Sequence, residues 1–228
     1  MVDTDTSMLE AASHRLMGAL KGKSIFNQGD PADAVYRVEH GCVRLQVDDE
    51  DGSRQVIAFV FAGQTFSAGL DVHWASAIAV TDTVLTSFPH ASLWALMDVD
   101  SRPAIALLSS ADQLLTDLAQ HLNRLTHSGA QERLSWFLEW LAQHCTEADP
   151  RIIRMPMGRQ DVADFLGIAP ETVSRLMRQM TMCGTLRPLG SRRYRYDSRA
   201  NVTGRRPSVV RSTRFARPTA GMQDLLAS

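Results

Sequence analysis

The sequence predicts an α+β protein that consists of an N-terminal β-barrel, a long helix and a C-terminal winged helix-turn-helix. Residues 24–89 contain short, evenly spaced apolar segments separated by glycine turns, a pattern typical of a β-sandwich or barrel. A helical pattern of leucines begins near Arg102. Two short helical segments then meet at Gly167 and precede a basic hairpin, which predicts the winged motif.

Composition restricts the class of protein. The 228 residues can bury one large core or two modest ones, and 44% hydrophobic with 21% charged residues describes a soluble globular chain. Apolar runs are too short for a membrane span, and residues 1–24 lack signal-peptide features, so we expect a cytoplasmic protein without membrane partners. Cys42, Cys145 and Cys183 are scattered, which suggests neither a disulfide framework nor a paired-cysteine metal site.

Charge is divided unevenly along the chain. Residues 1–150 carry a balance of −11, whereas residues 151–228 contain 15 arginines against 5 acids, a balance of +10. Such a division suggests two modules, with a polyanion as the partner of the second.

The N-terminal elements are predicted from alternation and turns. Residues 8–21 are expected to form a short helix with Leu9, Leu16 and Leu20 as its apolar points. After it, "VYRVEHGCVRLQV", "VIAFVFAGQTF" and "SAIAVTDTVLTSF" are predicted strands, and "DDEDGSRQ" is a polar turn.

The long helix that begins near Arg102 has two apolar stripes and therefore needs two partners. One face is expected to cover the barrel and the other to pair with a second copy of the chain. The predicted dimer stripe consists of Leu107, Ala111, Leu114, Leu118 and Leu125. A second stripe beside it consists of Leu108, Leu115 and Leu122. A fully buried intrachain helix is the alternative.

The C-terminal elements follow in order. "SGAQERLSWFLEWLAQH" is a predicted helix capped by Ser128, and "RQDVADFLG" is a short helix ended by Gly167. Pro170 suits the first position of the next helix, although Ala169 is a poor N-cap. "TLRPLGSRRYRYD" predicts two strands around Gly190.

The helix after Pro170 has one face for a core and one for a partner. Glu171, Ser174, Arg175 and Arg178 share one side. In a helix-turn-helix such residues enter the major groove, where arginine grips guanine and a carboxylate accepts from cytosine. We expect Glu171 and Arg175 to read bases and Ser174 to permit close approach. Residues expected at phosphates are Thr172, Arg178, Gln160, Arg192 and Arg193.

The segment "VADFLGIAPETVSRLMRQM" resembles the recognition motif of the CRP/FNR family of bacterial transcription regulators, and "ETVSR" resembles its FNR/FixK branch. "NQGDPADAVYRVEHGCVRLQ" is similar to the first strands of the family's cyclic-nucleotide-binding-like jelly roll, and "GAQERLSWFLEWLA" to its interdomain helix. The resemblance covers about residues 24–197. It implies a barrel domain over 1–101, a dimerisation helix over 102–127, a winged helix-turn-helix over 128–198 and a basic, flexible tail over 199–228.

The resemblance also implies a function. A homodimer would bind double-stranded DNA at a TTGAT-N4-ATCAA-like palindrome, with Glu171, Ser174 and Arg175 at the reading positions. Activation through RNA polymerase is the family norm. The family's corresponding loop lies near the polymerase, so the acidic turn Asp48, Asp49, Glu50 and Asp51 could meet a basic sigma-factor surface, although a plain solvated turn is the alternative.

Departures from the family concern the signal. Gln64 and His73-Trp74 stand where a cyclic-nucleotide binder needs glutamate and arginine, and no arginine occurs between Arg54 and Arg102, so the phosphate lacks a clamp. No cysteine precedes Cys42, which excludes the four-thiolate cluster of the oxygen sensors within one chain. We therefore expect no cofactor and control by protein abundance.

Several alternatives stay open. His14, His40, His73 and His90 leave a haem sensor possible. Cys183, among arginines at the end of the predicted recognition helix, is either a packing residue or a redox switch. Two other classes are a DNA-organising protein and a metal-dependent barrel enzyme, although no clustered metal ligands stand in the barrel segment.

Overall fold

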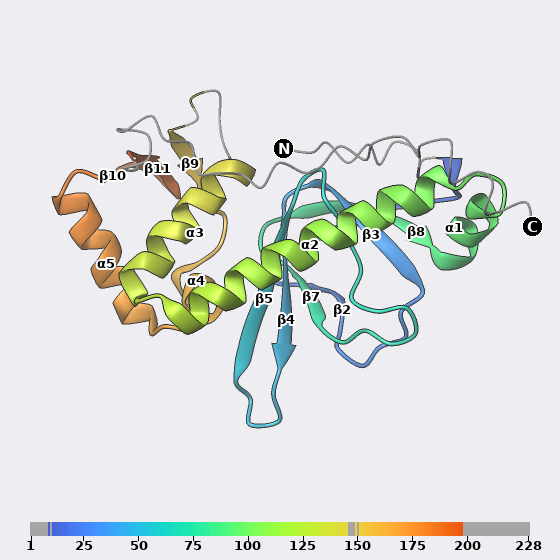
Figure 1. The fold of residues 1–228 in the computed structure, drawn as a ribbon, viewed down its shortest axis with the longest axis horizontal. Coiled ribbons are helices and arrows are strands. Elements are labelled where there is room, and N and C mark those ends of the chain that lie inside the picture. The colour runs from blue at the N-terminus through green and yellow to red at the C-terminus, as the bar shows by residue number, and fades with distance from the viewer. Residues whose placement is uncertain (1–8, 10, 146–148, 150, 198–228) are drawn as a thin grey trace, which may run out of the picture.

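The computed structural model describes Leu9, residues 11–145, Asp149 and residues 151–197. The predicted tail over 199–228 lies outside these residues. Two four-stranded antiparallel sheets form the N-terminal unit, with strand orders β1-β8-β3-β6 and β2-β7-β4-β5 (Figure 1). The strands are β1 Arg15–Ala19, β2 Ser24–Phe26, β3 Ala34–His40, β4 Cys42–Asp48, β5 Arg54–Phe61, β6 Thr65–Phe66, β7 Ser76–Ala79 and β8 Thr83–Pro89. The jelly-roll prediction is confirmed, as two facing sheets rather than a closed barrel.

The helix predicted over residues 8–21 is wrong. Arg15–Ala19 is strand β1, which pairs with β8 from Arg15↔Ser87 to Ala19↔Thr83. Leu16 and Leu20 are 67% and 68% exposed, so they do not form the apolar points of a packed helix. The open edge of β8 offered backbone partners that a local periodicity argument does not include.

Gly41, between β3 and β4, is a turn that only glycine fits. Its φ of +99° lies in the left-handed region, and an added Cβ would come within 2.6 Å of the Thr83 hydroxyl and 2.7 Å of the Asp82 carbonyl. This turn carries the chain from β3 in one sheet to β4 in the other, and Cys42 at the start of β4 belongs to the core shared with the C-terminal helices.

Strand β5 is apolar on both faces because both faces are covered. Ala58 and Val60 point into the sandwich core, whereas Phe59 and Phe61 belong to a second core that includes the C-terminal helices. Successive strand residues point to opposite sides, so the continuous apolar run "VIAFVF" serves two cores at once.

Two helices follow the sandwich. Helix α1 is His90–Met97, and α2 is Arg102–His127, as predicted. Helix α2 runs along the sandwich and carries the chain to the C-terminal unit (Figure 1). In that unit the elements are α3 Ala130–His144, β9 Ile152–Arg154, α4 Arg159–Leu166, α5 Pro170–Met182, β10 Leu186–Gly190 and β11 Arg193–Tyr196.

The structure divides the leucines of α2 differently from the prediction. Leu107 packs on the cluster of Leu9, Phe88 and Leu93, and Leu114 packs on the sandwich core. The exposed leucines are Leu108 at 71%, Leu115 at 65% and Leu122 at 62%. Leu107 and Leu114, both half-buried, thus have intrachain contacts, whereas the prediction gave them only a role in the dimer stripe.

His121 forms the buried end of α2. Its ring stacks on Phe165 of α4 at 4.0 Å and 3° and faces Trp136 of α3 at 5.6 Å. Burial lowers the pKa of His121 to about 4. Helix α2 is therefore anchored to the C-terminal unit by a neutral imidazole.

One correction concerns the start of α3. The N-cap is Gly129 rather than Ser128, and the Glu132 carboxylate accepts from the Gly129 N–H at 3.1 Å. Helix α3 otherwise buries Leu134, Phe137 and Leu141, together with Leu138, as its periodicity predicts.

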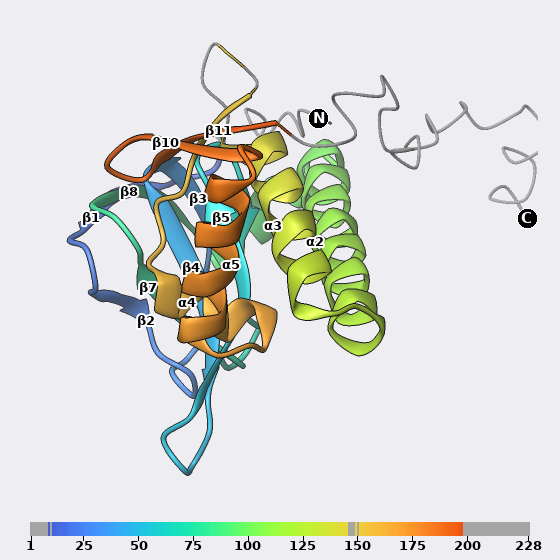
Figure 2. The same cartoon turned by 90° about the vertical axis from the view of Figure 1, so that its left-hand side faces the viewer.

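The strands β10, β11 and β9 form a three-stranded sheet. The predicted hairpin around Gly190 is thereby confirmed and extended by β9. With α4 and α5 it completes a winged helix-turn-helix, which lies to one side of the sandwich in Figure 1 and in front of it in Figure 2.

Candidate nucleic-acid interface

Helix α5 separates its two faces as the sequence predicted. Val173, Leu176, Met177 and Met180 are buried. Glu171, Arg175 and Arg178 are exposed, and Thr172 and Ser174 are partly exposed. In the described chain Glu171, Arg175 and Arg178 form no ion pair. The outer face therefore presents one carboxylate and two guanidinium groups to a partner.

The turn before α5 aims this face outward. Gly167 ends α4 with a left-handed φ of 60°, where its N–H donates to Ala163, and Ala169 begins α5 in an extended conformation. Pro170 occupies the first helical position, where its missing N–H costs no hydrogen bond.

Arg133 of α3 joins three helices, a role that the sequence did not reveal. Its guanidinium donates to Leu125 O at 2.8 Å, Ser128 O at 2.8 Å and Leu166 O at 3.0 Å. Carbonyls at the ends of α2 and α4 lack intrahelical donors. Arg133 satisfies them and fixes α4 at the end of the long helix.

A basic hollow beside α5 adds a second residue that sequence reasoning missed. Arg159, Ser174, Arg178 and Tyr194 line it, together with Met177, Thr181 and Pro188, and its volume is about 450 Å³. Arg159 is the first residue of α4. An arginine at the start of the first motif helix was the available sequence signal for a basic residue beside the outer face of α5.

The other residues predicted at phosphates are exposed, but some of them already form hydrogen bonds within the chain. Gln160 is exposed and donates to Asp164 at 2.7 Å. Arg192 is exposed but donates to the Pro156 carbonyl and adopts a positive φ of 57°. Arg193 is exposed on β11. Arg192 thus ties the hairpin turn to the segment before α4.

The three cysteines differ in environment. Cys183 at the end of α5 is exposed, whereas Cys42 is buried and Cys145 half-buried. Burial raises the pKa of the Cys145 thiol to about 12 and that of Cys42 well above its usual range. Exposure of Cys183 contradicts the alternative in which it packs the helix against the wing.

The acidic turn lies at the tip of the β4–β5 hairpin, which projects beyond the sandwich (Figures 1 and 2). The base is ordered, because Asp48 accepts from Gln46 at 2.6 Å and Ser76 at 3.2 Å. Hydrogen bonds from Ser53 lower the pKa of Asp51. The tip is therefore a preformed cluster of carboxylates.

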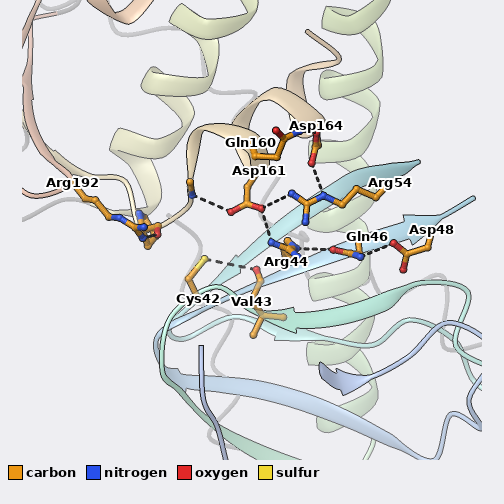
Figure 3. Close-up of polar contacts among 12 residues, drawn as sticks. Cys42, Val43, Arg44, Gln46, Asp48, Arg54, Gln160, Asp161, Asp164 and Arg192 are labelled. Atoms are coloured by element: carbon orange, nitrogen blue, oxygen red, sulfur yellow. Dashed lines mark hydrogen bonds and ion pairs between the residues drawn. The ribbon is translucent and has the colours of Figure 1, made fainter. Parts of the chain in front are cut away.

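Aromatic side chains pack in the interior of the sandwich. Phe26 contacts Tyr36 at 5.4 Å and Phe66 at 6.2 Å, and the buried His73 ring stacks on Phe26 at 3.6 Å. Gln64 accepts from the Phe61 N–H at 2.8 Å. Arg44 and Arg54 point away from this interior, toward α4 (Figure 3).

Among the described residues, no group of three or more His, Cys, Asp or Glu side chains is placed so that it could hold a metal ion. Among those same residues, no helix has the length and apolarity to cross a membrane. Of the histidines considered for haem, His73 and His90 are buried, whereas His14 and His40 are exposed.

Comparison with known proteins agrees with this architecture. Residues 19–100 match the cyclic nucleotide-binding domain, and residues 132–200 match the Crp-like helix-turn-helix domain. The nitrogen fixation regulation protein FixK of Rhizobium meliloti is 37% identical over 172 residues, which cover 73% of this chain and 75% of FixK. FixK of Azorhizobium caulinodans is 34% identical over 182 residues, covering 76% and 71%.

A solved structure shows the same fold. FixK2 from Bradyrhizobium japonicum superimposes with a TM-score of 0.78 at 28% identity, covering 86% of this chain and 98% of FixK2. Both domains and their order thus coincide with one group of regulators. The chain belongs to the CRP/FNR family and is a DNA-binding transcription regulator of the FNR/FixK type.

Proposed function

We propose that the protein binds a TTGAT-N4-ATCAA-like palindrome as a homodimer and activates transcription in the cytoplasm, without a cyclic nucleotide or another cofactor. The observation that carries this proposal is the outer face of α5, where Glu171, Ser174 and Arg175 lie without ion-pair partners in the described chain. Arg175 grips a guanine in the major groove, and Glu171 accepts from a cytosine. Arg159 and Arg178 contact phosphates beside it.

Base reading is tested by selecting sites from random DNA and then measuring affinities on the selected palindrome. Arg175→Ala should weaken specific binding by about 1–3 kcal/mol and relax selectivity at one base pair. Arg159→Ala is the matched control, because loss of a phosphate contact should weaken binding on all sequences alike. Equal weakening by Arg175→Ala on every sequence would remove its base-reading role. A protein that organises DNA would select no palindrome at all.

Dimerisation uses a seam on the exposed side of α2. Residues spaced by alternating three and four positions form this seam: Leu108, Ala111, Leu115, Leu118, Leu122 and Leu125. This is the heptad spacing of a coiled coil. It retains Ala111, Leu118 and Leu125 of the predicted stripe and replaces Leu107 and Leu114, which contact the chain's own clusters.

Independence from cyclic nucleotides follows from the filled interior and the missing arginine clamp. Calorimetry with cAMP and cGMP should detect no binding, and neither nucleotide should alter DNA affinity. Micromolar binding of either one would overturn this part of the proposal.

RNA polymerase is the proposed second partner, through the acidic tip of the β4–β5 hairpin. Its carboxylates suit a basic sigma-factor surface. Replacing Asp49, Glu50 and Asp51 with their amides or serine should reduce transcript yield in a purified system and leave DNA binding intact. Asp48 is kept as it is, because Gln46 and Ser76 donate to it. An unchanged yield rejects this contact.

A redox-controlled regulator is the second candidate, favoured by the exposure of Cys183. Peroxide would oxidise this thiol to a sulfenic acid, which a reductant reverses. Reversible loss of DNA binding in the wild type, and resistance of Cys183→Ser, are the expected results. Equal sensitivity of the two proteins contradicts the idea.

A further inference from the structure

Four charged side chains connect the sandwich to the first helix of the helix-turn-helix. Arg44 of β4 donates to Asp161 at 2.5 Å, and Arg54 of β5 donates to Asp161 at 3.1 Å and to Asp164 at 2.6 Å. Asp161 thus accepts from two arginines, and Arg54 reaches two carboxylates (Figure 3). Two positive and two negative groups balance one another.

These groups are largely shielded from water. Side-chain exposure is 12–13% for the two aspartates, 16% for Arg44 and 28% for Arg54. Ion pairs in such surroundings are screened less than exposed ones, and removing one partner leaves a charge without compensation. The cluster is therefore costly to open.

The ion pairs lie beside an apolar contact between the sandwich and the helices, and they restrict its orientation. Phe59 of β5 meets Phe165 of α4 at 5.2 Å and Phe137 of α3 at 6.3 Å. Apolar burial is non-directional, whereas a guanidinium fork requires a defined geometry. The arginines therefore select one orientation among those that the phenylalanines allow.

The backbone of α4 is held at the same place. Asp161 also accepts from the Gly158 N–H at 3.0 Å, and Gln55 donates to the Asp164 carbonyl at 2.6 Å. Because α4 ends at Gly167, only the short turn to Pro170 separates it from α5. The direction of α4 thus determines where the reading face points.

A line of hydrogen bonds extends the cluster along β4. Arg44 donates to Gln46 at 2.7 Å, and Gln46 donates to Asp48 at 2.6 Å. Alternate residues of a strand share one face, so this line runs from α4 to the base of the acidic hairpin.

We propose that Arg44, Arg54, Asp161 and Asp164 form an interdomain clamp that holds α5 in its DNA-reading orientation, in place of a bound effector. The clamp rests on the effector-independent function proposed above. The four residues do not contact DNA; they position the helices that do. Fixing the orientation beforehand removes an ordering cost from DNA binding.

A charge-exchange experiment on the full chain tests the clamp. Arg54→Glu and Asp164→Arg each place like charges together and should lower affinity for the selected palindrome by about 10-fold or more. The double variant restores opposite charges between positions 54 and 164 and should recover part of the affinity, because position 54 still faces Asp161. Arg102→Glu is the matched control, because Arg102 pairs with Asp100 in an exposed position outside the clamp; its affinity should stay within about twofold.

A second measurement does not depend on DNA. Amide hydrogen exchange in DNA-free protein should show faster exchange in α4 and in the turn from Gly167 to Pro170 for both single variants. Strand β4 should stay protected, and the double variant should return α4 partway to wild-type rates. If Arg54→Glu does not fold, Arg54→Gln and Arg44→Gln replace it, with smaller effects in the same direction.

The outcomes separate the two proposals. Folded single variants with wild-type exchange in α4 overturn the clamp, as does a double variant whose losses simply add. If the wild type selects no palindrome, the proposed function fails, and the exchange rates alone then decide on the clamp.

Discussion

Helices α5 and α2 both carry apolar residues at helical spacing, but the structure uses them differently. Helix α5 has one apolar face, which is buried, and one polar face, which is exposed. Helix α2 has apolar residues on adjacent faces, and the side with Leu107, Leu114 and His121 packs against the rest of the described chain. When a helix has one apolar stripe, the sequence shows which face is buried. When it has two adjacent stripes, the sequence does not show which of them packs within the chain.

The first experiment breaks the buried side of α5. Val173 is fully buried, so Val173→Asp places an unpaired charge in the core and should destabilise folding by about 3–5 kcal/mol. Met182→Asp on the same helix is the control, because Met182 is 81% exposed and should change stability by less than about 1 kcal/mol. Chemical denaturation gives both values. Similar losses for the two variants would refute the assignment of faces.

The second experiment addresses the exposed side of α2. Leu115→Glu places two carboxylates in the proposed seam and should weaken dimerisation by about 2–4 kcal/mol without unfolding the chain. Thr116→Glu, exposed and off the seam, should leave the dimer intact. Analytical ultracentrifugation measures the assembly. Leu114→Ala should instead lower folding stability and leave the dimer intact. If Leu114→Ala gave a monomer and Leu115→Glu a dimer, the dimer interface would lie on the Leu114 side of α2 and the proposed seam would be wrong.

The third experiment uses the buried histidine of α2. Because burial lowers the pKa of His121 to about 4, the unfolded chain takes up a proton near pH 6.5 that the folded chain excludes. The contribution is fully present above pH 6.5 and is lost as pH falls toward 4. The loss relative to neutral pH amounts to about 2 kcal/mol at pH 5. His121→Phe should flatten this part of the stability profile, and an identical slope in both proteins would contradict the assignment.

The smallest effect concerns the start of α5. Ala169 is an exposed N-cap without a side-chain hydrogen bond. Ala169→Ser adds an acceptor for the free N–H groups of the first turn and should stabilise folding by about 1 kcal/mol. Thermal unfolding detects this change, and Ala169→Val serves as a control that adds volume without an acceptor. A gain for valine equal to that for serine would exclude capping as the cause.

Much of the fold follows from local sequence. The glycine turn at Gly41, the left-handed stop at Gly167 and the start of α5 at Pro170 each require a backbone conformation that few residues adopt. Helices α3, α4 and α5 each bury one periodic apolar face. Such patterns involve residues that are neighbours along the chain, so they can be recognised without knowledge of the tertiary fold.

The error at β1 and the arginines whose roles were missed have a common cause. Strand β1 was predicted as a helix because its partner, β8, lies about seventy residues away in sequence. Arg133, Arg159 and the arginines of the clamp looked like ordinary surface residues, since their acceptors lie on other elements. Contacts between residues that are far apart in sequence produce no periodic pattern that a sequence reading could detect.

The sequence by itself determined the order of the two domains, the length of α2 and the division of α5 into a buried apolar face and an exposed polar face. Spacing and turn chemistry suffice for these features because each one is local. Tertiary structure alone decided which stripe of α2 stays exposed, and it placed Phe59 of β5 against Phe165 of α4. It also joined Arg44 and Arg54 to Asp161 and Asp164. These contacts connect residues more than one hundred positions apart, and only the packing of sandwich against helix brings them within bonding distance.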